Sequence, residues 1–124
     1  MGESLSITHF LHATLLVTHL ETSQHFYEAV LGLKPVDRDL SFAGAWYQIG
    51  PVQLHLIVAE ALIGDRVNHQ RWGRNRHLAF AVTDLDAMKR HIEACGCQIQ
   101  MSASGRAALF VSDPDDNMIE LTQV

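Results

Sequence analysis

The feature that most constrains the fold is an internal repeat with an offset of 65 residues. Residues 12–29 align with residues 77–94, and six of the 18 paired positions are identical. The same offset places Leu54-His55-Leu56 on Ile119-Glu120-Leu121. A second match at one offset argues against a chance similarity, so we expect one structural module to be used twice. The identical pairs are His12/His77, Val17/Val82, Thr18/Thr83, Leu20/Leu85, Glu28/Glu93 and Ala29/Ala94.

Both halves of the chain predict the same order of elements. A strand leads into an amphipathic helix, and a glycine suits the end of that helix, at Gly32 in the first half and Gly96 in the second. Short β-rich runs separated by turn residues follow each helix. The pattern predicts an α+β fold, with two β-α-β-β-β modules at about residues 7–59 and 76–124 inside one domain of residues 1–124. The arginine-rich stretch at residues 60–75 is expected to link the modules. The expected strands are residues 11–17, 46–49 and 52–58 in the first half and 78–82, 107–112 and 117–124 in the second, with a further strand near residues 34–41 or 98–102.

Composition limits the classes of function. The chain has 124 residues, of which 48% are hydrophobic, and a net charge of −5, and these values suit one globular domain. Mild acidity argues against nucleic acid or an anionic membrane as a partner. Cys95 and Cys97 are expected to be reduced thiols, because a disulfide that spans one residue would be strained. No apolar run approaches the ~20 residues of a membrane helix, and no signal sequence is recognised, so we expect a cytoplasmic protein.

Strand alternation places four polar side chains on equivalent faces of the two modules. In each strand the bulky residues share one side, which we expect the helix of that module to cover. The opposite faces are expected to form a cup lined by His12, His55, His77 and Glu120. A polar cluster that faces a cavity is costly unless its members bind something. Imidazole and carboxylate groups suit one divalent metal ion, such as Ni, Zn, Mn, Co or Fe, with coordination positions left open for a substrate.

The case for a ligand role differs between these residues. A single histidine on a strand is more often structural than a ligand, but the repeat raises His12, His77 and Glu120 above that expectation. For His55 three roles remain open, namely a fourth metal ligand, a partner that positions a ligand, or a proton shuttle. No role is expected for the other histidines, which are His9, His19, His25, His69 and His91.

Several strings in the chain resemble a known superfamily. The first half contains His12-Ala13-Thr14-Leu15-Leu16-Val17 and then Phe26-Tyr27-Glu28-Ala29-Val30-Leu31-Gly32. The second half contains Arg76-His77-Leu78-Ala79-Phe80 and then Asp113-Pro114-Asp115-Asp116-Asn117-Met118-Ile119-Glu120-Leu121. Over residues 7–124 the chain resembles the vicinal oxygen chelate superfamily, which includes glyoxalase I, extradiol dioxygenases, fosfomycin-resistance enzymes and bleomycin-resistance proteins.

The resemblance implies a cupped mixed sheet with the helices outside and a divalent metal inside, usually within a dimer. His12, His77 and Glu120 match metal-ligand positions of the superfamily, and His55 stands where glyoxalase I carries a glutamate. Leu16 stands where bacterial glyoxalases place an arginine that contacts glutathione. In comparison with the fosfomycin-resistance enzymes, Thr14 matches a threonine that contacts substrate, whereas Phe110 replaces a tyrosine.

These features together predict a glyoxalase-like, metal-dependent lyase or isomerase that acts as a homodimer on a small anionic molecule. The substrate would chelate the metal through neighbouring oxygens, and Glu120 or His55 would carry a proton. The alternatives are an antibiotic-binding protein of the bleomycin-resistance type, a fosfomycin-type thiol transferase and a dioxygenase. The residues expected to contact the substrate are Thr14, Trp46, Arg76, Arg106 and Phe110.

Overall fold

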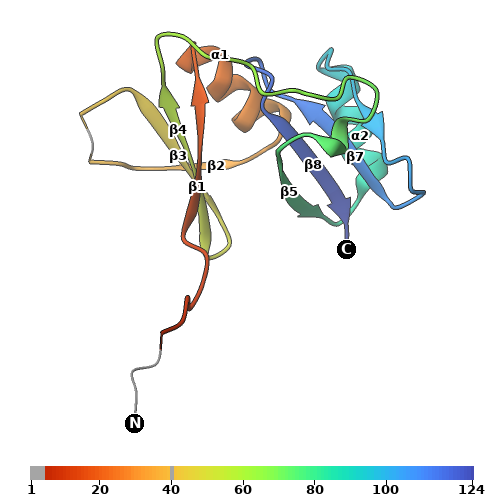
Figure 1. The fold of residues 1–124 in the computed structure, drawn as a ribbon, viewed down its shortest axis with the longest axis horizontal. Helices are drawn as coiled ribbons and strands as arrows, with labels where there is room; N and C mark the ends of the chain where they lie inside the picture. Colours follow the sequence, from red (N-terminus) through yellow and green to blue (C-terminus); the bar gives the residue numbers. More distant parts are fainter. Residues whose placement is uncertain (1–4, 40) are drawn as a thin grey trace.

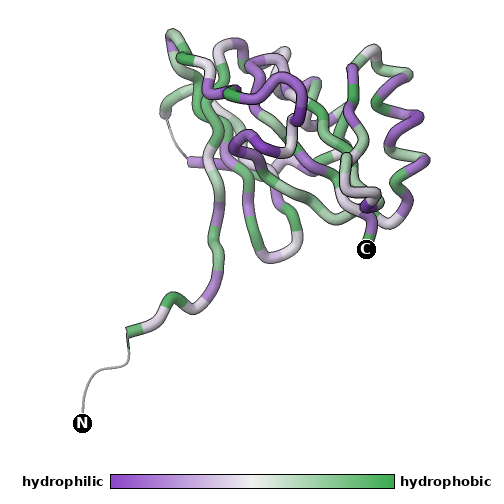
Figure 2. Tube along the Cα trace, turned by 45° about the vertical axis from the view of Figure 1, so that its right-hand side comes forward, coloured by the Kyte–Doolittle hydropathy of each residue, from purple (hydrophilic) through white to green (hydrophobic). Residues whose placement is uncertain are grey.

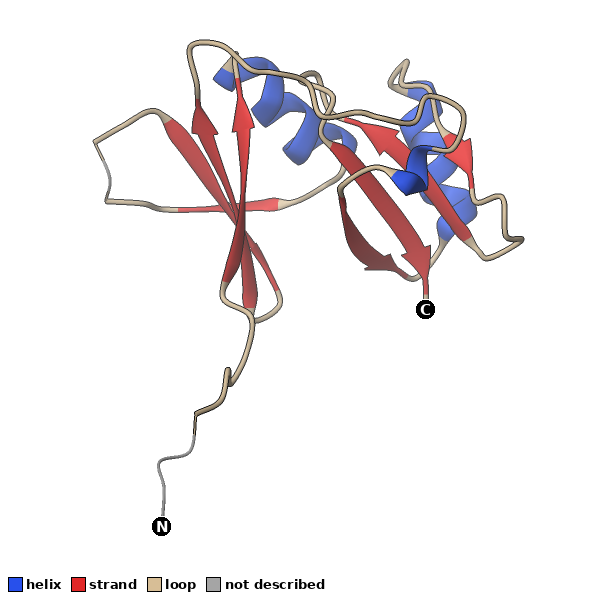
Figure 3. Ribbon diagram, in the orientation of Figure 1, coloured by secondary structure: helices blue, strands red, loops and turns tan. Residues whose placement is uncertain are grey.

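A computed structural model describes residues 5–39 and 41–124, whose strands form two four-stranded sheets (Figure 1). Each half of the chain contributes one sheet and the helices that pack on it (Figure 3). In both sheets the first strand of the half runs parallel to the last, and the other neighbours are antiparallel. The strand orders are β1-β4-β3-β2 and β5-β8-β7-β6, which are equivalent. The predicted α+β fold of two repeated modules is confirmed.

The bounds of the elements agree closely with the expected segments. The first half consists of β1 (His12–Val17), α1 (Leu20–Gln24), the π-helical segment η1 (His25–Val30), β2 (Lys34–Val36), β3 (Gly44–Ile49) and β4 (Val52–Val58). The second half consists of the 3-10 turn η2 (Trp72–Arg74), β5 (His77–Val82), α2 (Leu85–Ala94), β6 (Gln100–Met101), β7 (Ala108–Ser112) and β8 (Met118–Gln123). The strand expected near residues 34–41 ends earlier, at Val36, and Leu40 lies outside the described residues.

Local chemistry explains where the helices begin and end. The Asp84 side chain accepts a hydrogen bond from the Ala87 N–H and so caps the start of α2. Glycines with φ values of +77° and +85° follow the two helical segments, at Gly32 and Gly96 as predicted. Helix α2 alternates between hydrophilic and hydrophobic residues, as an amphipathic helix does (Figure 2). The first helix widens into a π-helix at His25, which hydrophobic periodicity does not predict.

The helix-covered face of each sheet carries the core. In the first sheet Tyr47, Leu54 and Leu56 are at most 1% exposed, and the Tyr47 ring lies 6.0 Å from the Tyr27 ring of η1. In the second sheet the corresponding fully buried residues include Leu109 of β7. Strand alternation therefore sends the other side chains to the face of the sheet that its helices leave free.

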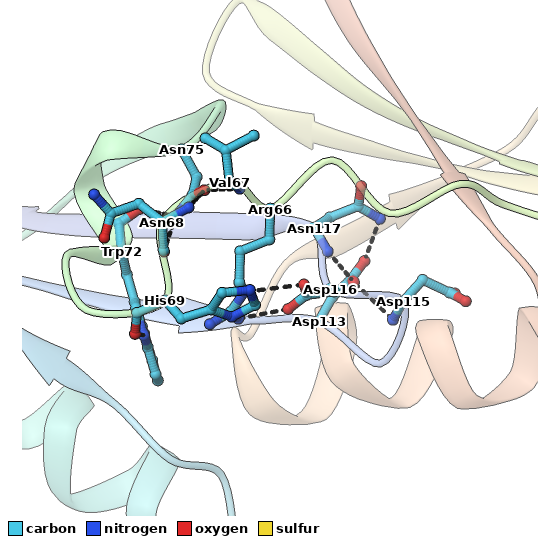
Figure 4. A network of polar contacts seen from close by, with 10 residues as sticks. All are labelled: Arg66, Val67, Asn68, His69, Trp72, Asn75, Asp113, Asp115, Asp116 and Asn117. Carbon is cyan, nitrogen blue, oxygen red and sulfur yellow. Dashed lines mark hydrogen bonds and ion pairs between the residues drawn. The ribbon is translucent and has the colours of Figure 1, made fainter.

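The turn between β7 and β8 (residues 113–117) holds the two halves together. Its carboxylates and amide bond to the helical part and first strand of the other half. Arg66, from the segment between the modules, forms an ion pair with Asp116 of the same turn (Figure 4). The contacts to the first half are Tyr27 hydroxyl to Asp113 (2.7 Å), Thr18 N–H to Asp115 (2.9 Å) and Asn117 amide to the Leu16 carbonyl (3.0 Å).

The segment between the modules, residues 60–75, covers part of the second sheet. A Cβ atom on Gly73 of η2 would lie 2.6 Å from the Phe110 ring, so only glycine permits this approach. The Trp72 N–H donates to the Gln100 side chain at 2.8 Å. The buried Asn75 amide accepts from the Val67 N–H and so fixes the path of the segment. Besides connecting the modules, this segment therefore packs over part of one face of the second sheet.

The outer surface includes an extended arm before β1. Residues 5–11 reach away from the body of the molecule (Figure 1), and all of them are exposed. The apolar side chains of this arm include Leu5, Ile7 and Phe10. Within residues 5–39 and 41–124, no helix combines the length and the apolar character that a membrane crossing requires.

Candidate metal and substrate site

Three aromatic rings stack in a row on the free face of the first sheet. His55 of β4 lies between Trp46 of β3 and His12 of β1, with ring centroids 4.3 and 4.1 Å away. The planes differ by only 9° and 15°. Strand register builds this row, because Trp46 pairs directly with His55 and β1 is the other neighbour of β4. The two imidazole rings therefore lie in nearly parallel planes.

A chain of two glutamines fixes the tautomer of His55. The Gln48 amide donates to the Gly50 carbonyl at 2.7 Å, which leaves its oxygen to accept from the Gln53 amide at 2.8 Å. The Gln53 oxygen then faces His55 Nε2 at 2.8 Å. An amide oxygen only accepts, so Nε2 carries the proton and Nδ1 keeps the lone pair. Burial, followed by the charges of His12 and Arg38, lowers the pKa of His55.

His77 and Glu120 form a second polar pair, on the second sheet. They lie on the neighbouring strands β5 and β8, and His77 Nε2 is 3.2 Å from a carboxylate oxygen of Glu120. His77 Nδ1 donates to the Asn75 carbonyl at 2.7 Å, so the neutral ring presents a lone pair at Nε2. Two acceptor atoms at this separation require a proton or a metal ion between them.

The surroundings of Glu120 keep its carboxylate charged. Burial alone would raise the pKa of Glu120, but the Thr122 hydroxyl, Arg106 and His77 outweigh it and leave the pKa below its ordinary value. Thr122 donates directly to one carboxylate oxygen, and Arg106 lies 3.4 Å from the same oxygen. The side chain of Glu120 is 10% exposed. A charged carboxylate in such a position is the form that binds a cation.

The two histidines of the first sheet, His12 and His55, remain apart from the His77–Glu120 pair of the second sheet within one copy of the chain. In the part of the chain that the structure describes, no three His, Cys, Asp or Glu side chains come close enough to hold one metal ion. The reason is the joint between the halves, which runs through the β7–β8 turn and through a bond from the His91 ring to the Ala29 carbonyl. This joint leaves the free faces of the two sheets separate. The single cluster of four residues expected from the sequence therefore does not form in one copy.

The other expected contact residues lie in different surroundings. Thr14 is exposed and pairs in register with His55. The Arg76 side chain is 85% exposed and lies 3.6 Å from Asp65, and both line a cavity of about 200 Å³ beside His77. Phe110 is buried beneath η2, with its ring edge-on to His77 at 5.6 Å, so it packs the site rather than lining an open surface.

Sequence reasoning missed Arg38, which lies just after β2. Its guanidinium carbon is 4.9 Å from the centre of the Phe42 ring and 5.9 Å from that of Trp46. Nη1 donates weakly to the Gly44 carbonyl at 3.4 Å. The buried atoms Nε and Nη2 have no hydrogen-bond partner among residues 5–39 and 41–124. An arginine between two aspartates gives no sequence signal of such a position.

The His77–Glu120 pair fits a divalent metal ion. Nitrogen and oxygen ligands lie about 2.0–2.2 Å from such an ion, so neighbouring ligand atoms are about 2.8–3.6 Å apart for octahedral to tetrahedral angles. The measured 3.2 Å between Nε2 and the carboxylate oxygen falls in this range. The bond from Nδ1 to the Asn75 carbonyl orients the ring as such bonds do in metal sites. His12 would supply a third ligand from the other sheet.

Comparisons with known proteins agree with the fold. The model of the Glyoxalase/Bleomycin resistance protein/Dioxygenase superfamily matches residues 9–121. The chain is 27% identical over 130 residues to "Glyoxylase I 4" of Arabidopsis thaliana, with 97% of this chain and 73% of the relative covered. A putative glyoxalase family protein from Bacillus anthracis matches with a TM-score of 0.80 at 20% identity, covering 98% of each chain. The fosfomycin resistance protein FosX from Listeria monocytogenes matches with a TM-score of 0.74 at 19% identity, covering 96% and 95%.

Proposed function

Because this chain belongs to the glyoxalase/bleomycin resistance protein/dioxygenase superfamily, we propose that it is a glyoxalase-like, divalent-metal-dependent lyase or isomerase. Its substrate is a small molecule that offers two neighbouring oxygens to the metal. The observation that carries the proposal is the pair formed by His77 and Glu120, whose facing acceptor atoms lie 3.2 Å apart. Such a pair is stable only with a cation or proton between its members.

The ligand set of the proposal is His12, His77 and Glu120. When bound, the metal would act as a Lewis acid that polarises the oxygens of the substrate. The metal is one of Ni, Zn, Mn, Co or Fe, since two imidazoles and one carboxylate suit each of these ions. Arg106 and Thr122 hold the Glu120 carboxylate in place and keep it charged.

His55 serves as a proton carrier in this proposal, and not as a fourth ligand. Ring nitrogens bind metals through lone pairs in the plane of the ring, and the planes of His12 and His55 differ by only 15° at a centroid distance of 4.1 Å. Lone pairs in nearly parallel planes do not converge on one ion. His55 presents an unprotonated Nδ1 that can accept a proton, and burial lowers the pKa of the ring, which favours its neutral form.

The complete site needs two copies of the chain. His12 and the His77–Glu120 pair are apart in one copy. In this proposal a second copy therefore brings its own His12 to His77 and Glu120 of the first chain. Both edge strands that this would use are accessible, and their exposed residues include Leu16 of β1 and Ala79 of β5. A sheet edge with exposed apolar groups favours association with another chain.

A second candidate function is the binding of an aromatic antibiotic without chemistry. The row of rings formed by Trp46, His55 and His12 supports it, because flat ligands stack on such surfaces. The two functions differ in their response to metal removal. Binding of an antibiotic to the rings would survive a chelator and the substitution His77→Ala, whereas lyase activity would not.

Metal binding by variants tests the proposal directly. We expect purified wild-type protein to bind one Co²⁺ or Ni²⁺ per chain in equilibrium dialysis, and His77→Ala to weaken this affinity by more than about 100-fold, since losing a ligand exceeds the loss of an outer-shell partner. His69→Ala is the matched control, because His69 is an exposed histidine in the covering segment. Equal metal binding by wild type and His77→Ala would overturn the proposal.

A further inference from the structure

Arg38 carries a pair of donors with the geometry that binds a carboxylate. The Nε and Nη2 atoms of a guanidinium lie side by side and can donate two parallel hydrogen bonds to the two oxygens of one carboxylate. The same chain shows this use in Arg66, whose Nε and Nη2 each donate to one oxygen of Asp116. In Arg38 the corresponding two atoms are buried and have no hydrogen-bond partner among the described residues.

The charge of Arg38 is also without a counter-ion in the described part of the chain. The ion pairs found there involve Arg66, Arg76, Arg106 and His77, and none of them includes Arg38. The neighbouring residues Asp37 and Asp39 are exposed. A cation with two buried, unpaired donors is costly, so its retention favours a function in binding an anion.

The position of Arg38 connects it to the candidate site. Its guanidinium carbon lies 5.9 Å from the centre of the Trp46 ring. The Trp46 ring stacks on His55, which in turn stacks on His12. The Nη1 atom of Arg38 is 3.4 Å from the Gly44 carbonyl, which places the guanidinium beside the start of β3. An anion bound by Arg38 therefore lies at one end of the row whose other end carries the metal ligand His12.

We propose that the Nε and Nη2 pair of Arg38 binds a carboxylate group of the substrate, at the end of the ring row opposite His12. This inference rests on the proposed function and narrows it, because it makes the substrate a carboxylic acid whose metal-chelating oxygens lie at a distance from the carboxylate. The bond is an ordinary charge-assisted hydrogen-bonded pair, and no covalent step is involved.

Phe42 is the group that must move for the carboxylate to enter. Its ring lies 4.9 Å from the guanidinium carbon, and the residue is 47% exposed, so it covers Arg38 from the solvent side. It belongs to the loop between β2 and β3 and not to a strand. A half-exposed loop side chain can change its rotamer at little cost, whereas Trp46 is held by its stack on His55.

The test is an NMR titration of the full chain with sodium acetate, against sodium chloride at equal ionic strength. We expect the Arg38 Nε–H signal to shift to saturation with acetate, while the Arg66 signal stays constant because Asp116 already occupies its donors. The indole N–H signal of Trp46 provides a second reporter that remains in every variant.

Arg38→Lys keeps the charge and loses the paired donors, and should weaken acetate binding about tenfold. Phe42→Ala should bind acetate more tightly than wild type.

The outcomes separate this inference from its alternatives. Equal shifts with acetate and chloride, or equal acetate affinity in Arg38→Lys, would overturn it. Tighter binding of inorganic phosphate than of acetate would replace the carboxylate with a tetrahedral anion. If the Arg38 Nε–H signal shifts with protein concentration but does not change with acetate, the Arg38 donors bind a carboxylate of a second copy of the chain, and the proposal is overturned. If the proposed metal site exists, Zn²⁺ added to the same sample shifts the His77 signals. The absence of acetate binding at Arg38 and the absence of metal binding at His77 are therefore observed separately.

Discussion

At the scale of single residues, the two best-placed histidines are held in opposite tautomers. His77 donates through Nδ1 to the Asn75 carbonyl and offers Nε2, whereas His55 donates through Nε2 to Gln53 and offers Nδ1. A backbone carbonyl fixes the first, and a side-chain amide anchored on the β3–β4 turn fixes the second. The two residues therefore suit different tasks, which are metal binding for His77 and proton transfer for His55.

The substitution His55→Phe tests this division of tasks. Phenylalanine keeps the flat ring between Trp46 and His12 but has no nitrogen, so we expect metal affinity within about threefold of wild type and a loss of activity of about 100-fold or more. Isothermal titration with Co²⁺ measures the first quantity, and turnover of an identified substrate measures the second. His12→Phe is the control, because it should abolish tight metal binding. A large loss of metal affinity in His55→Phe would make His55 a ligand after all.

The sequence predicted part of the site at this scale. Strand alternation correctly placed His12 and His55 on one face of the first sheet, and His77 and Glu120 on one face of the second, because a period of two is a property of the backbone itself. It could not identify Arg38 or the two glutamines. Arg38 lies in an irregular loop, and the glutamine chain depends on side-chain rotamers that no periodicity records.

At the scale of elements, the β7–β8 turn has two roles. It reverses the chain at Asp116, whose φ of +67° is unusual for a residue with a side chain, and it bonds to Thr18, Tyr27 and Arg66, which lie outside its own hairpin. Burial is the largest influence on Asp113 and raises its pKa, although the bonds from Tyr27 and Asn117 oppose that shift. The carboxyl group of Asp113 is therefore a buried joint between the halves.

Tyr27→Phe should weaken this joint, and Tyr47→Phe is its matched control. Both rings are fully buried and both hydroxyls donate to a carboxylate, but Tyr47 bonds to the partly exposed Glu28 within its own half. We expect Tyr27→Phe to lower the free energy of unfolding by about 2 kcal/mol and Tyr47→Phe by about 1 kcal/mol, measured by urea denaturation.

The pH dependence of these variants follows from the pKa of Asp113. The Tyr27 bond lowers this pKa, so its loss raises the pKa of the folded state further. A raised carboxyl pKa costs stability once pH exceeds the pKa of the unfolded chain, so the deficit of Tyr27→Phe should be larger at neutral pH than in acid. A deficit that is the same at both pH values would show that Asp113 does not depend on this hydroxyl.

The elements themselves were largely predictable, and the segment between the modules was not. The helix ends at Gly32 and Gly96 and the strand positions follow from short-range patterns. The covering role of residues 60–75 depends on contacts with residues far away in the chain, such as Gly73 with Phe110 and Trp72 with Gln100. A polar, arginine-rich composition predicts exposure, and most of these residues are exposed, but composition does not predict which residues of the second sheet the segment packs against.

At the scale of the whole molecule, the separation of the two polar pairs makes a prediction about mixed assemblies. If each site takes His12 from one chain and His77 from the other, a mixture of His12→Ala and His77→Ala chains contains some intact sites. Random exchange into dimers should restore about a quarter of the wild-type metal sites, because half of the dimers are mixed and each mixed dimer has one intact site. Each variant alone should have none.

The experiment unfolds and refolds the two variants together and counts tightly bound Co²⁺ by atomic absorption. Refolding each variant separately and mixing them only afterwards, under conditions where dimers do not exchange, is the control. Recovery in the refolded mixture alone supports a site shared between chains. No recovery in either case would show that each site is built within one chain after a rearrangement of the halves.

The cover over Phe110 makes the two halves unequal in their tolerance of mutation. Gly73 accepts no side chain without displacing the Phe110 ring, so the neighbourhood of His77 and Glu120 is under tight steric constraint. Around Arg38 and Phe42, by contrast, the described residues Asp37, Asp39, Ser41 and Ala43 are exposed. Over evolutionary time, and in a directed-evolution library, new ligand preferences should therefore arise in the first half, while the second half preserves the chemistry that every variant shares.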